Sequence, residues 1–298
     1  MSKNEILRKK LDGNSIIKVG GAFDAMSAKL VENSGFDAVW AGSFAISAVH
    51  ALPDASILTM TEFFNAASNM SSTCEIPIIA DCDTGYGGPN NVRYMVQKYE
   101  NAGISSICIE DKTFPKQNSL LENGKNDLLS QKEFVAKILA AKESRNDKNF
   151  IIIARVEALI SGAGMNEALN RATAYEKAGA DAILIHSKQK TPDEIFEFTD
   201  SWKGSAPIVV VPTTYDSVKI SELESHKIKM VIYANQTLRV AHMAMTRLLE
   251  DMIKVDHISD IKDKMSTMQD IFDLQEMYDI KNKEKKLEEE LKKLGYIN

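Results

Sequence analysis

The segment Asp81–Gly87, which reads Asp-Cys-Asp-Thr-Gly-Tyr-Gly, carries the strongest chemical signal in this sequence. Carboxylates two residues apart at the end of an extended strand point to the same side. Paired hard oxygen ligands suit Mg²⁺, which keeps several waters and takes further oxygens from its substrate. Glu110 and Asp111 follow another apolar run and can hold the waters of such a metal. We therefore predict a Mg²⁺ site at Asp81, Asp83 and Glu110; helix capping by Asp83 and ordinary surface carboxylates are the alternative.

Arg155 and His186 offer two positions for binding an anion. Arg155 directly follows the apolar run 151–154, and its planar guanidinium fork suits a carboxylate or a phosphoryl group. A structural ion pair with Glu157 is the alternative. His186 ends the apolar run 183–185. A satisfied core histidine is the alternative there, but its place beside other polar strand ends favours a hydrogen bond to a substrate oxygen.

Eight short apolar runs alternate with helical patterns and must position these side chains. Each run is about three to six residues long and almost continuously apolar, as expected of parallel strands buried on both faces. The alternation predicts an α/β fold, and the count of eight favours a closed (β/α)8 TIM-type barrel over an open, doubly wound sheet. The predicted strands are 16–19, 38–40, 77–80, 106–109, 150–155, 182–185, 208–211 and 230–233.

In such barrels the active site lies at the carboxyl ends of the strands. Seven of the predicted strands are followed there by polar side chains, which a chance distribution of surface residues explains poorly. The predicted strand-end groups are Ser43, Asp81, Asp83, Glu110, Asp111, Lys112, Arg155, Glu157, His186, Ser187, Lys188, Thr213, Thr214, Asn235 and Gln236.

Two regions do not follow the alternation of strands and helices. Residues 111–128 form a long polar stretch after a strand, and a loop of this length is usually functional. After residue 254 the chain is helical in pattern and densely charged. We predict a barrel domain over 1–254 and a helical extension over 255–298. The extension is either a solvated terminal helix or an arm that packs on a neighbouring subunit.

Composition narrows the class of protein. The 298 residues carry a net charge of −6, which disfavours a nucleic-acid partner but allows an anionic substrate held by local cations. The three cysteines are widely spaced in apolar segments and indicate reduced, buried thiols. The first residues lack the apolar core of a signal peptide, and the apolar runs are shorter than the ~18 residues of a membrane span. We expect a cytoplasmic protein without a membrane partner.

Several longer phrases make the chain resemble the phosphoenolpyruvate mutases of the isocitrate lyase superfamily. The resemblance covers about residues 5–275 in order. The Asp-x-Asp-Thr-Gly-Tyr-Gly phrase marks the superfamily, whereas Glu-Asp-Lys-x-Phe-Pro-Lys-x-Asn-Ser is much narrower. The matching stretches are 81–87, 108–120, 154–158, 178–188 and 210–213.

The resemblance implies a role for each matching residue. Asp81 would anchor Mg²⁺, with Asp83 and Glu110 holding its water shell. Arg155 and His186 would contact a phosphoryl group. The remaining expected site residues are Trp40, Gly42, Ser43 and Phe44 around the substrate and its carboxylate, Asp54 near the reacting carbon, and Lys116, Asn118 and Ser119 on a gating loop that closes over the substrate.

The implied reaction moves a phosphoryl group from the oxygen of phosphoenolpyruvate to C3, giving phosphonopyruvate, the first step of phosphonate biosynthesis. Phosphonopyruvate hydrolases keep the metal site and the loop but lack an asparagine where Asn118 stands. The C–C lyases of the superfamily carry a catalytic cysteine in this loop, and here Cys108 precedes it. A barrel used only for binding or assembly is a further alternative, which the intact Asp81, Asp83 and Glu110 disfavour. The family suggests a homo-oligomer, a dimer or tetramer.

Overall fold

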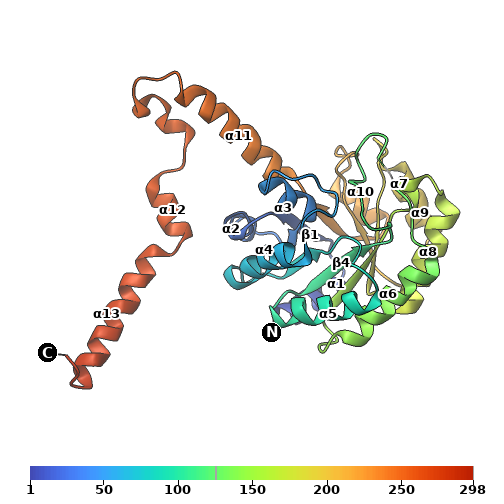
Figure 1. The fold of residues 1–298 in the computed structure, drawn as a ribbon, viewed down its shortest axis with the longest axis horizontal. Helices are drawn as coiled ribbons and strands as arrows, with labels where there is room; N and C mark the ends of the chain where they lie inside the picture. Colours follow the sequence, from blue (N-terminus) through green and yellow to red (C-terminus); the bar gives the residue numbers. More distant parts are fainter. Residues whose placement is uncertain (125, 298) are drawn as a thin grey trace. The chain divides into compact units, whose positions relative to one another are not determined.

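A computed structural model describes residues 1–124 and 126–297, so residue 125 of the predicted gating loop and residue 298 of the predicted extension lie outside the described residues. Eight parallel strands pair in chain order, and β1 pairs with β8 to close a barrel (Figure 1). The predicted (β/α)8 barrel is therefore confirmed. The strands are β1 Ile17–Ala22, β2 Ala38–Ala41, β3 Ile78–Asp81, β4 Ser106–Glu110, β5 Ile151–Val156, β6 Ala182–Ile185, β7 Ile208–Val210 and β8 Ile228–Tyr233.

The inside of the barrel is a packed core. Alternate residues of each strand point inward, because side chains on a strand alternate between its two faces. Val19, Ile79, Ile153 and other inward residues form one apolar cluster, and helix α1 (Lys3–Asp12) adds the buried Leu7 and Leu11 to it. A second, larger cluster lies between the strands and the helices that surround them. The interior is thus filled with apolar side chains.

The helices surround the barrel, and several contact their neighbours along the ring (Figure 1). Side-chain caps fix where some of them begin: Ser130, for example, accepts a hydrogen bond from the backbone N–H of Glu133 at the start of α6. The helices of this ring and its connections are α2 Ala25–Asn33, α3 Ser43–Val49, α4 Met60–Thr73, α5 Pro89–Asn101, α6 Gln131–Ser144, α7 Ala158–Ser161, α8 Met165–Ala178, α9 Asp193–Ser201 and α10 Ile220–Ser225.

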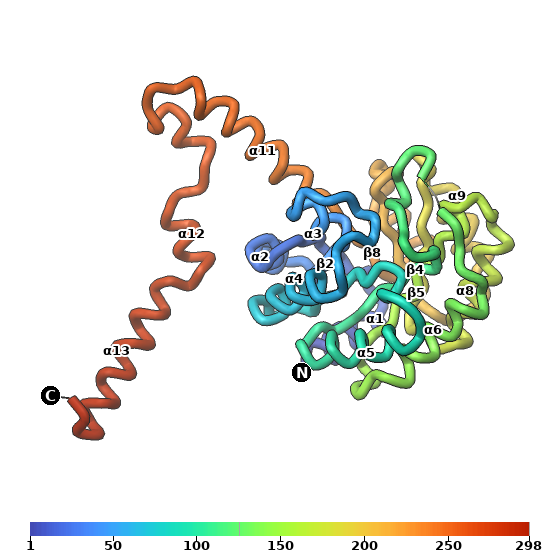
Figure 2. The backbone as a smooth tube through the Cα atoms, in the orientation of Figure 1, coloured from blue at the N-terminus to red at the C-terminus, as the bar shows by residue number. Residues whose placement is uncertain are grey.

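The predicted gating loop leaves the barrel after β4 and returns into α6 (Figure 2). Its two ends are joined as a short antiparallel stem. Lys112 bridges Leu128, the N–H of Thr113 donates to the carbonyl of Asp127 (2.9 Å), and the N–H of Leu129 donates to the carbonyl of Asp111 (2.9 Å). The stem anchors the loop beside the ends of β4 and β5.

The chain forms two compact units, Met1–Leu238 and Arg239–Asn298. The second unit is helical, with most of α11 (Gln236–Met252), a 3₁₀ helix (Ile258–Lys264), α12 (Met268–Leu274) and α13 (Met277–Lys293). Among its described residues, Ile261 is the single buried apolar side chain. Within the described ranges no helix is both long and apolar enough to span a bilayer.

Candidate active site

Polar side chains from neighbouring strands meet at one end of the barrel. Asp81 is the last residue of β3 and Glu110 the last of β4, and Glu110 lies beside Arg155 of β5 in the sheet register. His186 directly follows β6. Because inward positions recur every second residue, Asp81, Glu110, Arg155 and His186 continue the inward-facing rows of their strands. The expected clustering of these groups at the carboxyl ends is present.

The turn after β3 has an unusual backbone. Asp83 (φ +50°), Tyr86 (φ +57°), Gly85 (φ +87°) and Gly87 (φ +140°) all have positive φ. A Cβ on Gly85 would lie 2.8 Å from Val92, so the tight turn also needs a glycine there for space. This conformation brings Asp83 back toward Asp81, whose Oδ1 accepts the backbone N–H of Asp83 (3.2 Å).

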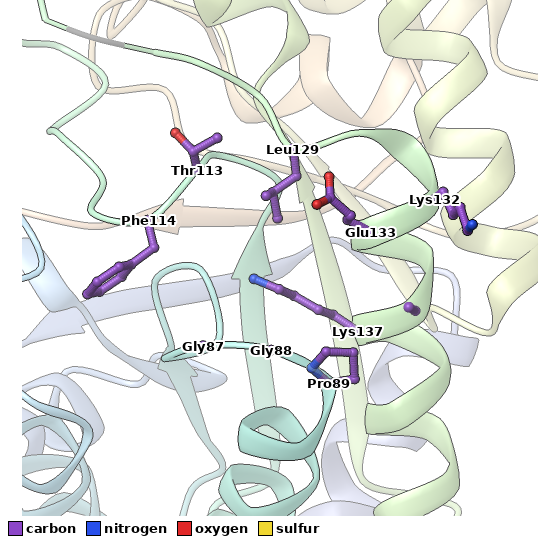
Figure 3. A pocket seen from close by; sticks show the side chains of 10 residues that line it. Gly87, Gly88, Pro89, Thr113, Phe114, Leu129, Lys132, Glu133 and Lys137 are labelled. Carbon is purple, nitrogen blue, oxygen red and sulfur yellow. The ribbon is translucent and has the colours of Figure 1, made fainter.

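Lys137 of α6 supports this turn from behind. Its ammonium is largely buried and donates to the carbonyl of Thr84 (2.7 Å). Figure 3 shows Lys137 extending across a pocket of about 640 Å³, with Phe114 on one side and Lys132 directed away. Burial lowers the pKa of Lys137. The pocket thus lies next to the turn that presents Asp83, separate from the polar cluster itself.

Lys116 of the gating loop reaches into the carboxylates. Its Nζ lies 2.7 Å from Asp83 Oδ1, 3.0 Å from Asp54 Oδ1 and 3.1 Å from Ser43 Oγ. Burial opposes its charge, but Asp83, Glu110 and Asp54 raise the pKa of Lys116 well above its ordinary value. The predicted gating loop therefore lies over the strand ends, with a buried ammonium among their carboxylates.

Asn118 and Asp54 join the loop to the segment after α3. The side-chain amide of Asn118 donates to Asp54 Oδ2 (2.8 Å). Burial opposes ionisation of Asp54, but Lys116 and Asn118 outweigh it and lower the pKa of this carboxyl. Burial and the nearby carboxylates act in the other direction at Asp83 and raise its pKa to about 7 despite Lys116. The cluster holds more negative charge than Lys116 alone can neutralise.

Glu157 connects the loop to the predicted anion-binding pair. Its fully buried carboxylate accepts hydrogen bonds from Arg155 Nε (2.5 Å), from His186 Nδ1 (2.8 Å) and from Ser119 Oγ of the loop (2.6 Å). Burial opposes ionisation, but Arg155 and His186 hold the pKa of Glu157 well below its ordinary value. Arg155 and His186 are therefore fixed by one shared anion.

The tautomer of His186 follows from this arrangement. Nδ1 lies 2.8 Å from both Glu157 Oε1 and Arg155 Nη2. An ionised carboxylate can only accept and a guanidinium can only donate. We assign the proton to Nδ1, where it bonds to Glu157, because Arg155 Nη2 has a second acceptor in Ser119 Oγ (3.2 Å). Burial lowers the pKa of His186, and a neutral ring with its proton on Nδ1 would keep its lone pair on Nε2.

Asp111 supports Glu157 from outside the barrel. Its fully buried carboxylate accepts the backbone N–H of Glu157 (2.9 Å) at one oxygen and both Arg171 (3.0 Å) and the Tyr175 hydroxyl (2.7 Å) of α8 at the other. Asp111 was a predicted strand-end group, but its side chain faces α8. It cannot hold the waters of a metal in the barrel mouth, because strand alternation turns it away from Glu110.

The remaining predicted site residues fall into two groups. Trp40 is buried in the barrel interior, and Ser43 donates to Asp81 Oδ2 (2.9 Å). A Cβ on Gly42 would lie 2.8 Å from the Trp40 indole nitrogen, so glycine lets the ring approach the backbone. Phe44, by contrast, is 42% exposed on α3 and belongs to neither core cluster.

The donor set fits a hard divalent cation. Neither oxygen of Glu110 accepts a hydrogen bond from a described residue, although both are buried. The described residues contain no ready-made group of three ligating side chains. Mg²⁺ does not require one, because it is commonly held by one or two carboxylates and completes its shell with water and substrate oxygens. A cation here would also offset the excess negative charge around Asp83.

Comparison with known proteins agrees with this geometry. The sequence profile of the family described as phosphoenolpyruvate phosphomutase matches residues 7–253. A phosphonopyruvate hydrolase of Variovorax sp. (strain Pal2) is 44% identical over 276 residues, covering 92% of this chain and 95% of the relative. The structure of a phosphoenolpyruvate phosphomutase from Streptomyces platensis subsp. rosaceus superposes with a TM-score of 0.93 at 43% identity, covering 95% and 98% of the two chains.

A crystal structure of phosphonopyruvate hydrolase in complex with oxalate and Mg²⁺ is similarly close, with a TM-score of 0.90 at 42% identity over 95% of this chain and 98% of that one. Mutases and a hydrolase thus resemble this chain to about the same degree. The profile match over most of the sequence and the strand-end cluster of carboxylates, arginine and histidine lead to one conclusion: the chain belongs to the phosphoenolpyruvate phosphomutase family.

Proposed function

We propose that this chain is a phosphoenolpyruvate mutase, an isomerase that interconverts phosphoenolpyruvate and phosphonopyruvate. The observation that carries the proposal is the side chain of Asn118, which reaches from the closed loop to Asp54 inside the site. An asparagine at this position is the feature that the resemblance associates with mutases and not with hydrolases. The proposal gives Asn118 and Asp54 a place beside the reacting carbon.

The anion-binding pair suits the migrating phosphoryl group. A loose, metaphosphate-like transition state needs positioned positive charge more than a nucleophile. Arg155 retains its charge and is oriented by Glu157. An approaching dianion would favour protonation of the bare nitrogen of His186, which then donates to a phosphoryl oxygen. In the forward direction the O–P bond breaks, C3 of the pyruvate enolate attacks phosphorus, and no other reactant is consumed.

The closed loop supports transfer without hydrolysis. The side chains of Lys116 and Ser119 are almost fully buried. Water admitted beside a metaphosphate-like group would convert it to inorganic phosphate. Lys116 and Asn118 therefore serve to exclude water as well as to contact the reacting groups. Trp40 would form a wall of the pocket, and the backbone and side chain at Gly42 and Ser43 would receive the substrate carboxylate.

The proposed cofactor is Mg²⁺, held by Asp81 with Asp83 and Glu110 orienting its waters. The buried oxygens of Glu110 that accept no hydrogen bond within the described chain support this assignment. When bound, the ion would supply positive charge to the phosphoryl and enolate oxygens. The related phosphonopyruvate hydrolase was crystallised in complex with oxalate and Mg²⁺, which is consistent with the same cofactor here.

Hydrolysis of phosphonopyruvate and C–C bond cleavage are the two alternative reactions. Hydrolysis of phosphonopyruvate is the second candidate, because the Variovorax hydrolase is 44% identical to this chain. A C–C lyase reaction is disfavoured by the cysteines. Burial raises the pKa of Cys82 and of Cys108 well above the ordinary thiol value, and Cys74 lies in a different connection. None of the three belongs to the gating loop.

We further propose that the C-terminal segment 255–298 is an extension of the 1–254 catalytic domain that packs on another copy of the chain. Within this segment, apolar side chains are exposed on both helices, among them Met268 of α12 (64%) and Leu287 of α13 (62%). Exposed apolar surface of this kind is typical of a protein interface. The proposed assembly is a homodimer or homotetramer.

The deciding experiment is ³¹P NMR of the purified protein with phosphonopyruvate and Mg²⁺, with and without EDTA. A metal-dependent phosphoenolpyruvate signal is the expected result. Inorganic phosphate as the primary product would instead establish the hydrolase. Conversion that is unaffected by EDTA would contradict the metal assignment.

A further inference from the structure

Lys112 is a buried lysine at the base of the gating loop that neither the predicted site nor the proposed mechanism uses. Its side chain is about 2% exposed. Nζ donates to the carbonyl of Gln117 (2.6 Å) and to Ser119 Oγ (2.8 Å), both in the loop. Lys112 therefore holds the loop by two of its three N–H donors.

Two carboxylates lie just beyond hydrogen-bonding range of the same ammonium. Glu110 Oε1 is 3.6 Å and Glu157 Oε2 is 3.8 Å from Lys112 Nζ. A flexible lysine side chain can cross that difference by a small rotation. The ammonium thus has two alternative sets of acceptors, one in the loop and one at the strand ends.

The hydroxyl of Ser119 contacts both the loop-holding ammonium of Lys112 and the strand-end residues Arg155 and Glu157. It donates to Glu157 Oε2 (2.6 Å) and accepts from Lys112 and from Arg155. If the loop moved away, Lys112 would lose both loop acceptors, and Glu110 and Glu157 would be its nearest remaining acceptors. An unsatisfied buried ammonium is costly, so it would turn to Glu110 and Glu157.

We propose that Lys112 is a positioning residue that exchanges partners when the gating loop closes. In the closed state it bonds to Gln117 and Ser119; in the open state it bonds to Glu110 and Glu157. Closure then has two effects in one step: it tethers the loop and withdraws the ammonium from Glu110. This inference rests on the proposed function, because it concerns the readiness of Glu110 for the waters of a metal.

Hydrogen exchange of the full-length protein without substrate tests the tether directly. The N–H groups of Lys116, Leu120 and Leu121 are hydrogen-bonded in the closed loop, to Ser56 Oγ, Asn118 Oδ1 and the Asn118 carbonyl. In Lys112→Met we expect peptides covering 116–121 to exchange roughly tenfold faster or more, because the loop loses hydrogen bonds to a charged group.

Lys137→Met is the matched control, since it also removes a largely buried ammonium, one bonded to Thr84 instead of the loop. It should leave exchange in 116–121 close to that of the wild-type protein. Ser119→Ala alone should also accelerate exchange. Combined with Lys112→Met, it should add little further acceleration, since both substitutions remove the same hydrogen bond between Lys112 and Ser119. Unchanged exchange in a folded Lys112→Met protein, or fully additive effects, would overturn the proposal.

Two further readouts separate this inference from the proposed reaction. If Lys112→Met fails to fold, unchanged exchange in Ser119→Ala overturns the proposal equally. Product identity by ³¹P NMR then tests the reaction alone. If the wild-type protein releases phosphate but Lys112→Met speeds exchange in the loop, the mutase is refuted and the proposed role of Lys112 stands. If the wild-type protein is a mutase but Lys112→Met leaves exchange in the loop unchanged, the role of Lys112 is refuted and the mutase stands. With the mutase established, Lys112→Met should raise the share of phosphate among its products.

Discussion

Glu157→Gln isolates the charge that holds the anion-binding pair. The substitution keeps the size of the side chain but removes the shared anion from Arg155, His186 and Ser119. Breaking a buried ion pair on one side costs about 3–5 kcal/mol. Glu110 Oε2, 3.3 Å from Arg155 Nε, retains part of the pairing, so we expect the low end of that range. A loss of about 3 kcal/mol corresponds to a fall in Tm of about 6–12 °C.

Differential scanning calorimetry at pH 7 without Mg²⁺ measures this loss. Glu197→Gln, an exposed position on α9, is the matched control and should change stability by less than about 0.5 kcal/mol. Because the pKa of Glu157 is lowered on folding, its stabilising contribution is present above its ordinary pKa of 4.5 and is lost as pH falls through the lowered value. The two variants should therefore differ at pH 7 and converge in acid.

A Tm of Glu157→Gln within about 2 °C of the control at pH 7 would refute this reasoning. It would mean that Arg155 and His186 are held by packing and by Glu110, and that the carboxylate of Glu157 adds no net stability. A large loss that persists after pH has fallen through the lowered pKa of Glu157 would also contradict it, because a protonated Glu157 resembles glutamine in charge.

Three further predictions concern the metal, the loop and the assembly. Asp81→Ala should abolish Mg²⁺-dependent turnover and leave the far-UV circular dichroism unchanged; full activity would refute the metal assignment. Asn118→Ala should slow turnover or divert product to phosphate in ³¹P NMR, and an unchanged rate and product would remove the argument for a mutase. Truncation after residue 254 should lower the mass measured by light scattering from that of a dimer or tetramer toward a monomer, whereas an unchanged mass would place the interface elsewhere.

The sequence predicted the barrel and the convergence of the site because both follow from short-range periodicity. Continuous apolar runs identify buried parallel strands, and a strand period of two places Asp81, Glu110, Arg155 and His186 on the inward side. The first strand was predicted too short. It was ended at residue 19, but Gly20 and Gly21 extend β1, where a Cβ on Gly21 would lie 2.3 Å from the carbonyl of Ala234.

Contacts that depend on the path of the loop or on backbone dihedral angles could not be predicted from the sequence. Lys112 looked like one more strand-end polar residue, and its bonds to Ser119 depend on how the loop folds back. The positive φ of Asp83 is visible only in the structure. Glu157 was predicted as a strand-end group and as an alternative ion-pair partner of Arg155, but its bonds to His186 and Ser119 depend on the next strand and on the loop.

The closure of the barrel has a consequence for how the chain is made. Ile17 of β1 pairs with Met230 of β8, so the ring cannot form until most of the polypeptide has left the ribosome. Until then β1 has one unpaired edge, and Leu7 and Leu11 of α1 cannot pack against a complete barrel interior. Strand β1 thus waits for β8 before its second edge is paired, and the nascent chain exposes that edge while the residues between the two strands are translated.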